Sequence, residues 1–157
     1  MAAHSPAAVS EPAVHAAAAA AHRATVSACD LVTRADVVQA LGFAVEQGRG
    51  HDEAFASTCD YAARHGQISV TFQRLGKTLD VEAAMAALQA SIPDSSVRKA
   101  RGLGARAFFL DIAGAGTQLY VIRDGSEYLM VSVLGLGEAA QVAPVAEAIA
   151  RRALGRL

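Results

Sequence analysis

The chain has 157 residues, 53% of them hydrophobic, and its 14 basic and 15 acidic side chains leave a formal net charge of −1. This length is typical of one domain with a substantial core, and the balanced charge argues against a dedicated nucleic-acid-binding protein, which normally carries a basic excess. The sequence contains no run of about 18 large apolar residues, which argues against a transmembrane helix.

The first 27 residues form a block of Ala, Ser, Pro and His with almost no large apolar side chain. Because such a segment has no apolar stripe to dock, we predict a flexible arm over 1–27 and a single folded domain over 28–157. The arm lacks the basic start and the Leu-, Val- or Phe-rich core of a secretory signal peptide. The protein is therefore either cytosolic or a mature chain from which a signal has been removed.

Short elements open the predicted domain. Thr33 and Asp36 have the spacing of a capping box, and Gly42 is a typical helix stop, so a helix is expected over about 34–41. The segments that follow are expected to form a strand, a polar turn and a second strand, over 43–47, 48–53 and about 56–64.

The middle of the domain has the clearest periodicity. Residues 67–74 alternate between apolar and polar side chains, which predicts a strand with one face in water. The next segment, about 79–90, has apolar residues three and four positions apart and acidic residues in its first turn. That pattern predicts an amphipathic helix, which the Ile92-Pro93-Asp94 segment ends.

The second half of the domain is dominated by strands. They are expected over about 96–100, 106–112, 117–123 and 127–134. Asp124-Gly125 is a pair typical of the type I′ turn that joins two hairpin strands. The final helix is expected to start near residue 140, because Pro144 is best tolerated in a first turn.

This order of elements predicts an α+β fold. It consists of an antiparallel sheet of about six to seven strands, with about three helices packed mainly on one face. The strand–helix–strand alternation of a Rossmann fold is missing.

Two cysteines, Cys29 and Cys59, leave two alternatives open. Neither belongs to a Cys-x-x-Cys pair, so the sequence gives no support to a thioredoxin-type or zinc-ribbon site. The cysteines either form one disulfide in an oxidising compartment or remain two buried thiols in a cytosolic protein.

Candidate functional residues are few. The one charge cluster, Arg98, Lys99, Arg101 and Arg106, either binds an anionic ligand or partner or protects an edge strand against pairing. The His51-Asp52-Glu53 segment and His65 are interpreted as polar turns, and Gly102-Leu103-Gly104 as a turn without the helix that a phosphate site needs. We therefore predict no catalytic residue, no metal site and no cofactor.

Residues 29–42, which read Cys-Asp-Leu-Val-Thr-Arg-Ala-Asp-Val-Val-Gln-Ala-Leu-Gly, resemble the opening of a family of small bacterial lipoproteins and secreted proteins of unknown function. Cys59-Asp60-Tyr61 and Gly102-Leu103-Gly104 match two later motifs of that family. The resemblance implies a fold similar to the PsbP-like extrinsic photosystem subunits, export from the cytoplasm and a Cys29–Cys59 disulfide. No lipobox cysteine is visible near the start, so the resemblance does not extend to a lipid anchor.

These observations together predict a periplasmic or secreted protein of the bacterial envelope. We expect a non-catalytic binding or interaction module, monomeric, that binds an envelope protein or an anionic ligand and no nucleic acid. The exposed sheet face with Ser69, Thr71 and Gln73, next to the basic cluster, is the expected contact surface. The alternative is a small-ligand carrier or an enzyme with a pocket between sheet and helices.

Overall fold

The computed structural model describes residues 26–104 and 106–157, so the predicted arm lies outside the described residues except for Val26 and Ser27. The described part of the chain contains four helices, α2 (Ala28–Leu31), α3 (Arg34–Leu41), α4 (Val81–Ser91) and α5 (Ala139–Leu154). It also contains seven strands: β1 (Arg49–Asp52), β2 (Ala56–Ala62), β3 (Gln67–Arg74), β4 (Ser95–Ala100), β5 (Arg106–Ile112), β6 (Gly116–Arg123) and β7 (Glu127–Leu134). None of these helices is long and apolar enough to cross a membrane.

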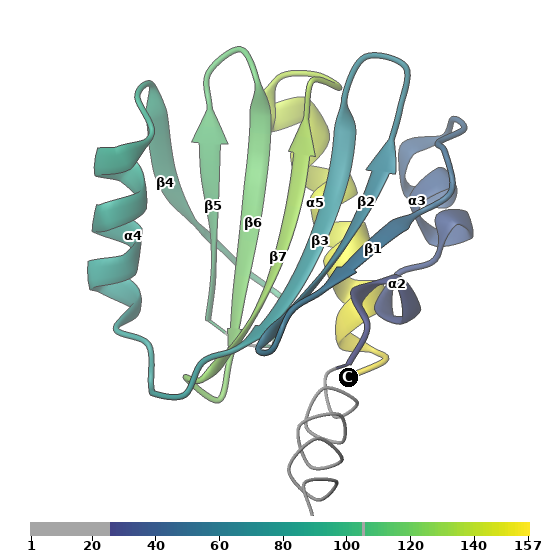
Figure 1. Cartoon of the computed structure of the whole chain (residues 1–157). Helices are drawn as coiled ribbons and strands as arrows, with labels where there is room; N and C mark the ends of the chain where they lie inside the picture. Colours follow the sequence, from purple (N-terminus) through teal and green to yellow (C-terminus); the bar gives the residue numbers. More distant parts are fainter. Residues whose placement is uncertain (1–25, 105) are drawn as a thin grey trace, which may run out of the picture.

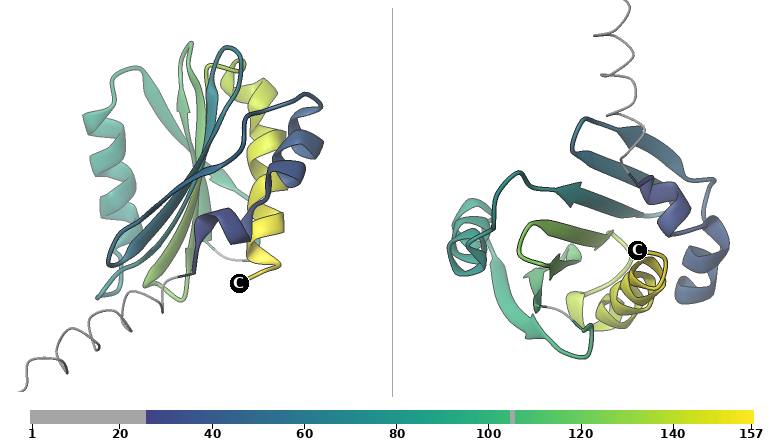
Figure 2. Two further views of the ribbon diagram at one scale, coloured as in Figure 1. Left: turned by 45° about the vertical axis from the view of Figure 1, so that its right-hand side comes forward. Right: turned by 90° about the horizontal axis from the view of Figure 1, so that it is seen from below.

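The seven strands form one antiparallel sheet in the order β1-β2-β3-β7-β6-β5-β4 (Figure 1). β7 is central and pairs with β3 and β6, so the two halves of the chain meet in the middle of the sheet. α2, α3 and α5 lie on one side of the sheet, and α4 lies alone on the other (Figure 2). The predicted α+β fold, with an antiparallel sheet and helices mainly on one face, is confirmed.

Capping residues explain where α3 begins and ends and where α4 begins. The Thr33 hydroxyl accepts a hydrogen bond from the Asp36 backbone N–H while the Asp36 carboxylate accepts one from the Thr33 N–H, which completes the predicted capping box of α3. Gly42 ends that helix in the left-handed conformation, with φ at +82°. Asp80 caps α4 through its carboxylate.

The main core lies between α5 and the sheet. β3 alternates as predicted, with Ile68, Val70 and Phe72 buried and the residues between them partly exposed. The buried stripe of α5, with Ala146, Ile149 and Ala153 fully buried, packs against this face. A smaller apolar cluster, centred on Val81, Phe108 and Ile122, lies under α4 on the opposite face.

The region between α3 and β2 corrects two predictions. Residues 43–47 are not a strand, and the strand β1 occupies 49–52, where a polar turn was expected. β1 is an edge strand whose four residues are all exposed, so it needs no apolar residues and its sequence is similar to that of a turn. In the expected strand, Val45 is buried as a single anchor while its neighbours are exposed.

α5 begins at Ala139, in agreement with the predicted start near residue 140, and Pro144 lies in its second turn. Proline has no backbone N–H, so the carbonyl four residues earlier, that of Ala140, loses its helical partner. Ala140 is exposed, which lets water take the place of that partner.

Gly48 precedes β1 at a point of close approach, and Gly48→Ala is expected to destabilise the domain. A Cβ at this position would lie 2.7 Å from both Cys59 Sγ and a ring carbon of Tyr61. Both side chains are buried, so neither can move aside without a loss of packing. We expect a loss of about 1–3 kcal/mol in the free energy of unfolding, measured by denaturant titration. Gly76→Ala is the control, because nothing lies within 4 Å of a Cβ there. Equal stability of the two variants would contradict this packing.

Candidate functional site

The sheet face under α4 carries a row of aromatic side chains. Phe108 of β5 and Tyr120 of β6 are paired directly across the strands and stack with their ring centroids 5.0 Å apart. Tyr128 of β7 continues the row at 6.3 Å from Tyr120. Aromatic pairs at these separations are mutually attractive, so the row forms a firm platform on this face.

Both tyrosines of the row have hydrogen-bonded hydroxyl groups. Tyr120 donates to Gln118 Oε1 at 3.0 Å, and Tyr128 donates to Oε1 of Gln73 on β3. Burial raises the pKa of Tyr120 to about 12, with a further contribution from Tyr128, and burial also raises the pKa of Tyr128. At neutral pH both hydroxyls therefore stay protonated and act as polar groups beside an apolar surface.

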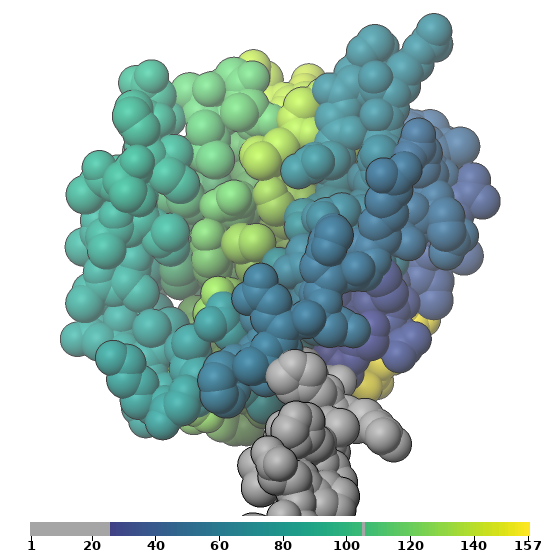
Figure 3. All heavy atoms as spheres, viewed as in Figure 1, coloured from purple at the N-terminus to yellow at the C-terminus, as the bar shows by residue number. Residues whose placement is uncertain are grey.

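A cleft of about 220 Å³ lies between this row and α4. We call it the aromatic cleft. Its helix side is formed by Leu79, Ala84 and Leu88, and its floor by strand residues Phe108, Tyr120, Ile122, Tyr128 and Met130. Val81 is the only buried residue of α4, so the helix covers this face loosely. The green strands β5–β7 remain visible to the right of α4 in the space-filling view (Figure 3).

The predicted basic cluster is divided by the structure. Lys99, Arg101 and Arg106 line a groove of about 240 Å³ on the other flank of α4, which we call the basic groove. Arg98 lies on the opposite face of β4, with its guanidinium 3.9 Å above the Phe109 ring, where it forms an ion pair with Asp111. Arg98 therefore covers the edge of the main core and does not belong with the other three.

The predicted contact row on β3 is also separated from the basic residues. Ser69, Thr71 and Gln73 are partly exposed on the same face as the aromatic row. Three strands, β7, β6 and β5, stand between them and β4, so the expected neighbourhood of the two features is wrong. What lies beside Gln73 is Tyr128, at the open end of the aromatic cleft.

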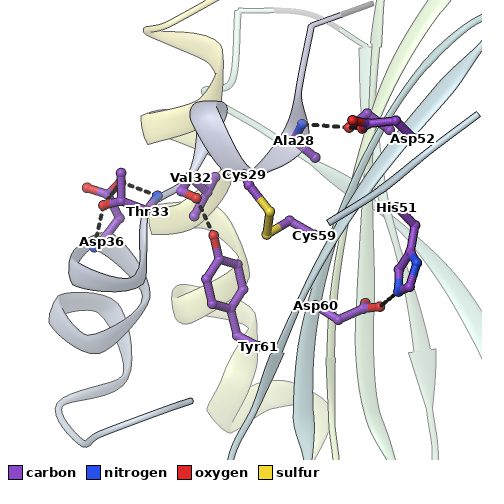
Figure 4. The surroundings of a disulfide bond; sticks show 11 residues. Ala28, Cys29, Val32, Thr33, Asp36, His51, Asp52, Cys59, Asp60 and Tyr61 are labelled. Carbon is purple, nitrogen blue, oxygen red and sulfur yellow. Dashed lines mark hydrogen bonds and ion pairs between the residues drawn. A yellow bond between two sulfur atoms is a disulfide. The ribbon is translucent and has the colours of Figure 1, made fainter. Parts of the chain in front are cut away.

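The structure joins Cys29 of α2 to Cys59 of β2 in a disulfide (Figure 4). Cys59 is fully buried, and the pairing leaves no free thiol as a nucleophile in the described residues. The nearby Tyr61 hydroxyl donates to the Val32 carbonyl, and the Ala28 N–H donates to the Ser57 hydroxyl at 2.8 Å. These contacts fasten α2 to β2 beneath the edge of the sheet.

The predicted polar-turn residues do not converge on a site. His51 of β1 lies 3.7 Å from Asp60 in an exposed pair, while His65 lies in the exposed β2–β3 turn. Within residues 26–104 and 106–157, no three His, Cys, Asp or Glu side chains are grouped so that they could hold a metal ion.

Sequence reasoning missed one charged cluster, which joins α3 to the end of α5. Asp36 is buried and accepts hydrogen bonds from Arg152 at 2.8 Å and from Arg156. Arg156 also donates to the Leu31 carbonyl at 2.7 Å. The bond from Arg156, with those from Thr33, holds the pKa of Asp36 well below its usual range although burial opposes the shift. The paired residues lie about 120 positions apart, so the pairing has no local signal in the sequence.

Comparison with protein-family models, with curated proteins and with solved structures finds no match for this chain. The relation to PsbP-like proteins and to the family of small exported proteins therefore stays a prediction.

Proposed function

We propose that this domain is a non-catalytic binding module of the bacterial envelope that holds a small ligand in the aromatic cleft. The observation that carries the proposal is the cleft itself, an apolar hollow with hydrogen-bonded tyrosine hydroxyls at its floor. Ligand sites in proteins typically combine an apolar lining with a few fixed polar groups. The disulfide supports a periplasmic or secreted location, because such bonds persist mainly in oxidising compartments.

The chemistry of the cleft favours binding over catalysis. Its titratable side chains are Tyr120 and Tyr128, whose raised pKa values keep both protonated near neutral pH. A general acid or base works best when its pKa lies near the working pH, so these tyrosines are poorly matched to proton transfer. They are well suited to fixing the orientation of a ligand through hydrogen bonds.

A second candidate is the docking of a partner protein on the same face. It is favoured by the partly exposed polar row Ser69, Thr71 and Gln73, which continues the surface beyond Tyr128. A partner that covers this row would also close the open end of the aromatic cleft. Substitution of Thr71 by arginine separates the two candidates, because it obstructs such a partner while leaving the lining of the cleft unchanged.

The small-ligand proposal predicts that filling the cleft abolishes ligand-induced stabilisation. Ala84 lines the cleft and Ala86, on the same helix, is exposed, so Ala84→Leu and Ala86→Leu form a matched pair. In a thermal-shift screen of bacterial metabolites, we expect at least one compound to raise the melting temperature of the wild type and of Ala86→Leu but not of Ala84→Leu. A screen without such a compound, or hits that stabilise all three proteins equally, would contradict the proposal.

A further inference from the structure

We propose that the ligand of the aromatic cleft is an anionic amphiphile, with an alkyl chain in the cleft and a negatively charged headgroup at the basic groove. This inference rests on the proposed function and adds the chemical class of the ligand. Carboxylate and phosphate headgroups share the required chemistry, and the experiment below distinguishes them.

The two sites are joined around the start of α4. A third hollow, of about 360 Å³, shares Leu79 and Ile122 with the aromatic cleft. The same hollow shares Val81 and Arg106 with the basic groove. These shared residues place the hollow next to both sites, along the path that the ligand is proposed to follow.

The basic groove has unused positive charge. Neither Lys99 nor Arg101 forms an ion pair within residues 26–104 and 106–157. Arg106 pairs with Glu82 at 3.2 Å, but both side chains are more than half exposed, so a ligand can compete for this arginine. Three cations thus face one carboxylate, an arrangement that fits a carboxylate or a phosphate.

The other end of the path fits an alkyl chain. The aromatic cleft is lined by Leu, Ile, Met and Ala side chains besides its aromatic rings, and it contains no charged residue. Burial of a methylene group in such a lining is favourable, whereas burial of a charge there is not. The contrast between the two ends therefore sets the direction in which an amphiphile would lie.

Calorimetric titration with three decyl compounds, used below their micelle-forming concentrations, tests the proposal. The probes are decanoate, decyl phosphate and the neutral decyl glucoside, and inorganic phosphate serves as the headgroup without a chain. We expect at least one anionic decyl compound to bind at least tenfold more tightly than decyl glucoside, and inorganic phosphate to bind far more weakly. The ranking of decanoate against decyl phosphate shows which headgroup the groove prefers.

Variants locate the two halves of the ligand. The double variant Lys99→Glu with Arg101→Glu is expected to lose the preference for anionic over neutral probes, because both side chains are exposed and their replacement should leave the fold intact. Arg64→Glu, at an exposed position outside the path, makes the same charge reversal as each of these substitutions and serves as the control. Ala84→Leu is expected to lower the affinity for all three decyl compounds by a similar factor. Circular dichroism verifies that each variant is folded.

The outcomes separate this inference from the proposed function. Equal affinity for the anionic and neutral decyl compounds, or an anionic preference that survives the Lys99 and Arg101 substitutions, would overturn the inference and leave a neutral ligand for the cleft. If no decyl compound binds while a metabolite in the thermal-shift screen depends on Ala84, the proposed function stands and the inference fails. If neither kind of compound binds, both fail.

Discussion

Loss of the Cys29–Cys59 disulfide is expected to lower the free energy of unfolding by about 3–4 kcal/mol, the chain-entropy estimate for a loop closed by residues 30 apart. A domain of this size has a total stability of roughly 5–15 kcal/mol, so the loss is a large fraction. The affected segment is α2 with the edge of the sheet, because the bond ties the first helix of the described chain to β2.

The measurement compares the wild type with Cys29→Ala/Cys59→Ala in denaturant titrations, each with and without a reducing agent. Reductant should bring the wild type close to the double variant and should leave the double variant unchanged. Alkylation of the unreduced native protein, followed by intact mass, should add no label. Rapid labelling of two thiols in protein recovered from its own host would contradict both the disulfide and the proposed export.

Asp36→Asn is expected to cost about 3 kcal/mol at pH 7, the lower end of the range for breaking a buried ion pair. The carboxylate side chain is only 6% exposed, but those of Arg152 and Arg156 are 44% and 39% exposed, so water partly compensates the cations that are left behind. The substitution also weakens the capping box of α3 and the link from α3 to α5.

The effect of Asp36 should depend on pH. Because its pKa is lower in the folded than in the unfolded state, the carboxylate stabilises the fold fully above the unfolded value of about 3.9 and loses this contribution as the pH falls further. Urea titrations at pH 7, 5 and 3 should therefore show a large and constant gap between wild type and variant at the first two values, and a smaller gap at the third. Asp30→Asn, at an exposed position in α2, is the control. A gap that widens in acid would contradict the assignment.

The sequence allowed most of the fold to be predicted because several signals are local. The alternation over 67–74, the Thr33–Asp36 capping box and Gly42 act over a few residues, and each predicts its element without knowledge of the rest of the chain. β1 was not predicted, because this exposed edge strand has no apolar residues and therefore no alternation of apolar and polar side chains. The side of the sheet that α4 covers was not predictable either, since its apolar stripe would fit either face.

The candidate site was less accessible to sequence reasoning. Successive residues of a strand point to opposite faces, so Arg98 and Lys99 could not both belong to one cluster, and this parity could have been applied at the outset. The aromatic row is different, because Phe108, Tyr120 and Tyr128 come together only when the registers of β5, β6 and β7 are known. The Asp36–Arg156 pair likewise depends on how α5 crosses the sheet.

The hydrogen bond from Arg156 to the Leu31 carbonyl brings the first and last helices of the described chain to one corner of the molecule, where the C-terminus lies close to the start of α2 (Figure 1). A short linker could join residues 157 and 26 at this corner, so a circular permutant built from residues 26–157, with new ends in the exposed β1–β2 turn, should still fold. An attachment at residue 157 holds the protein by that same corner. α4 and the aromatic cleft lie on the other side of the sheet from α5, so this attachment does not occupy the face that carries the cleft (Figure 2).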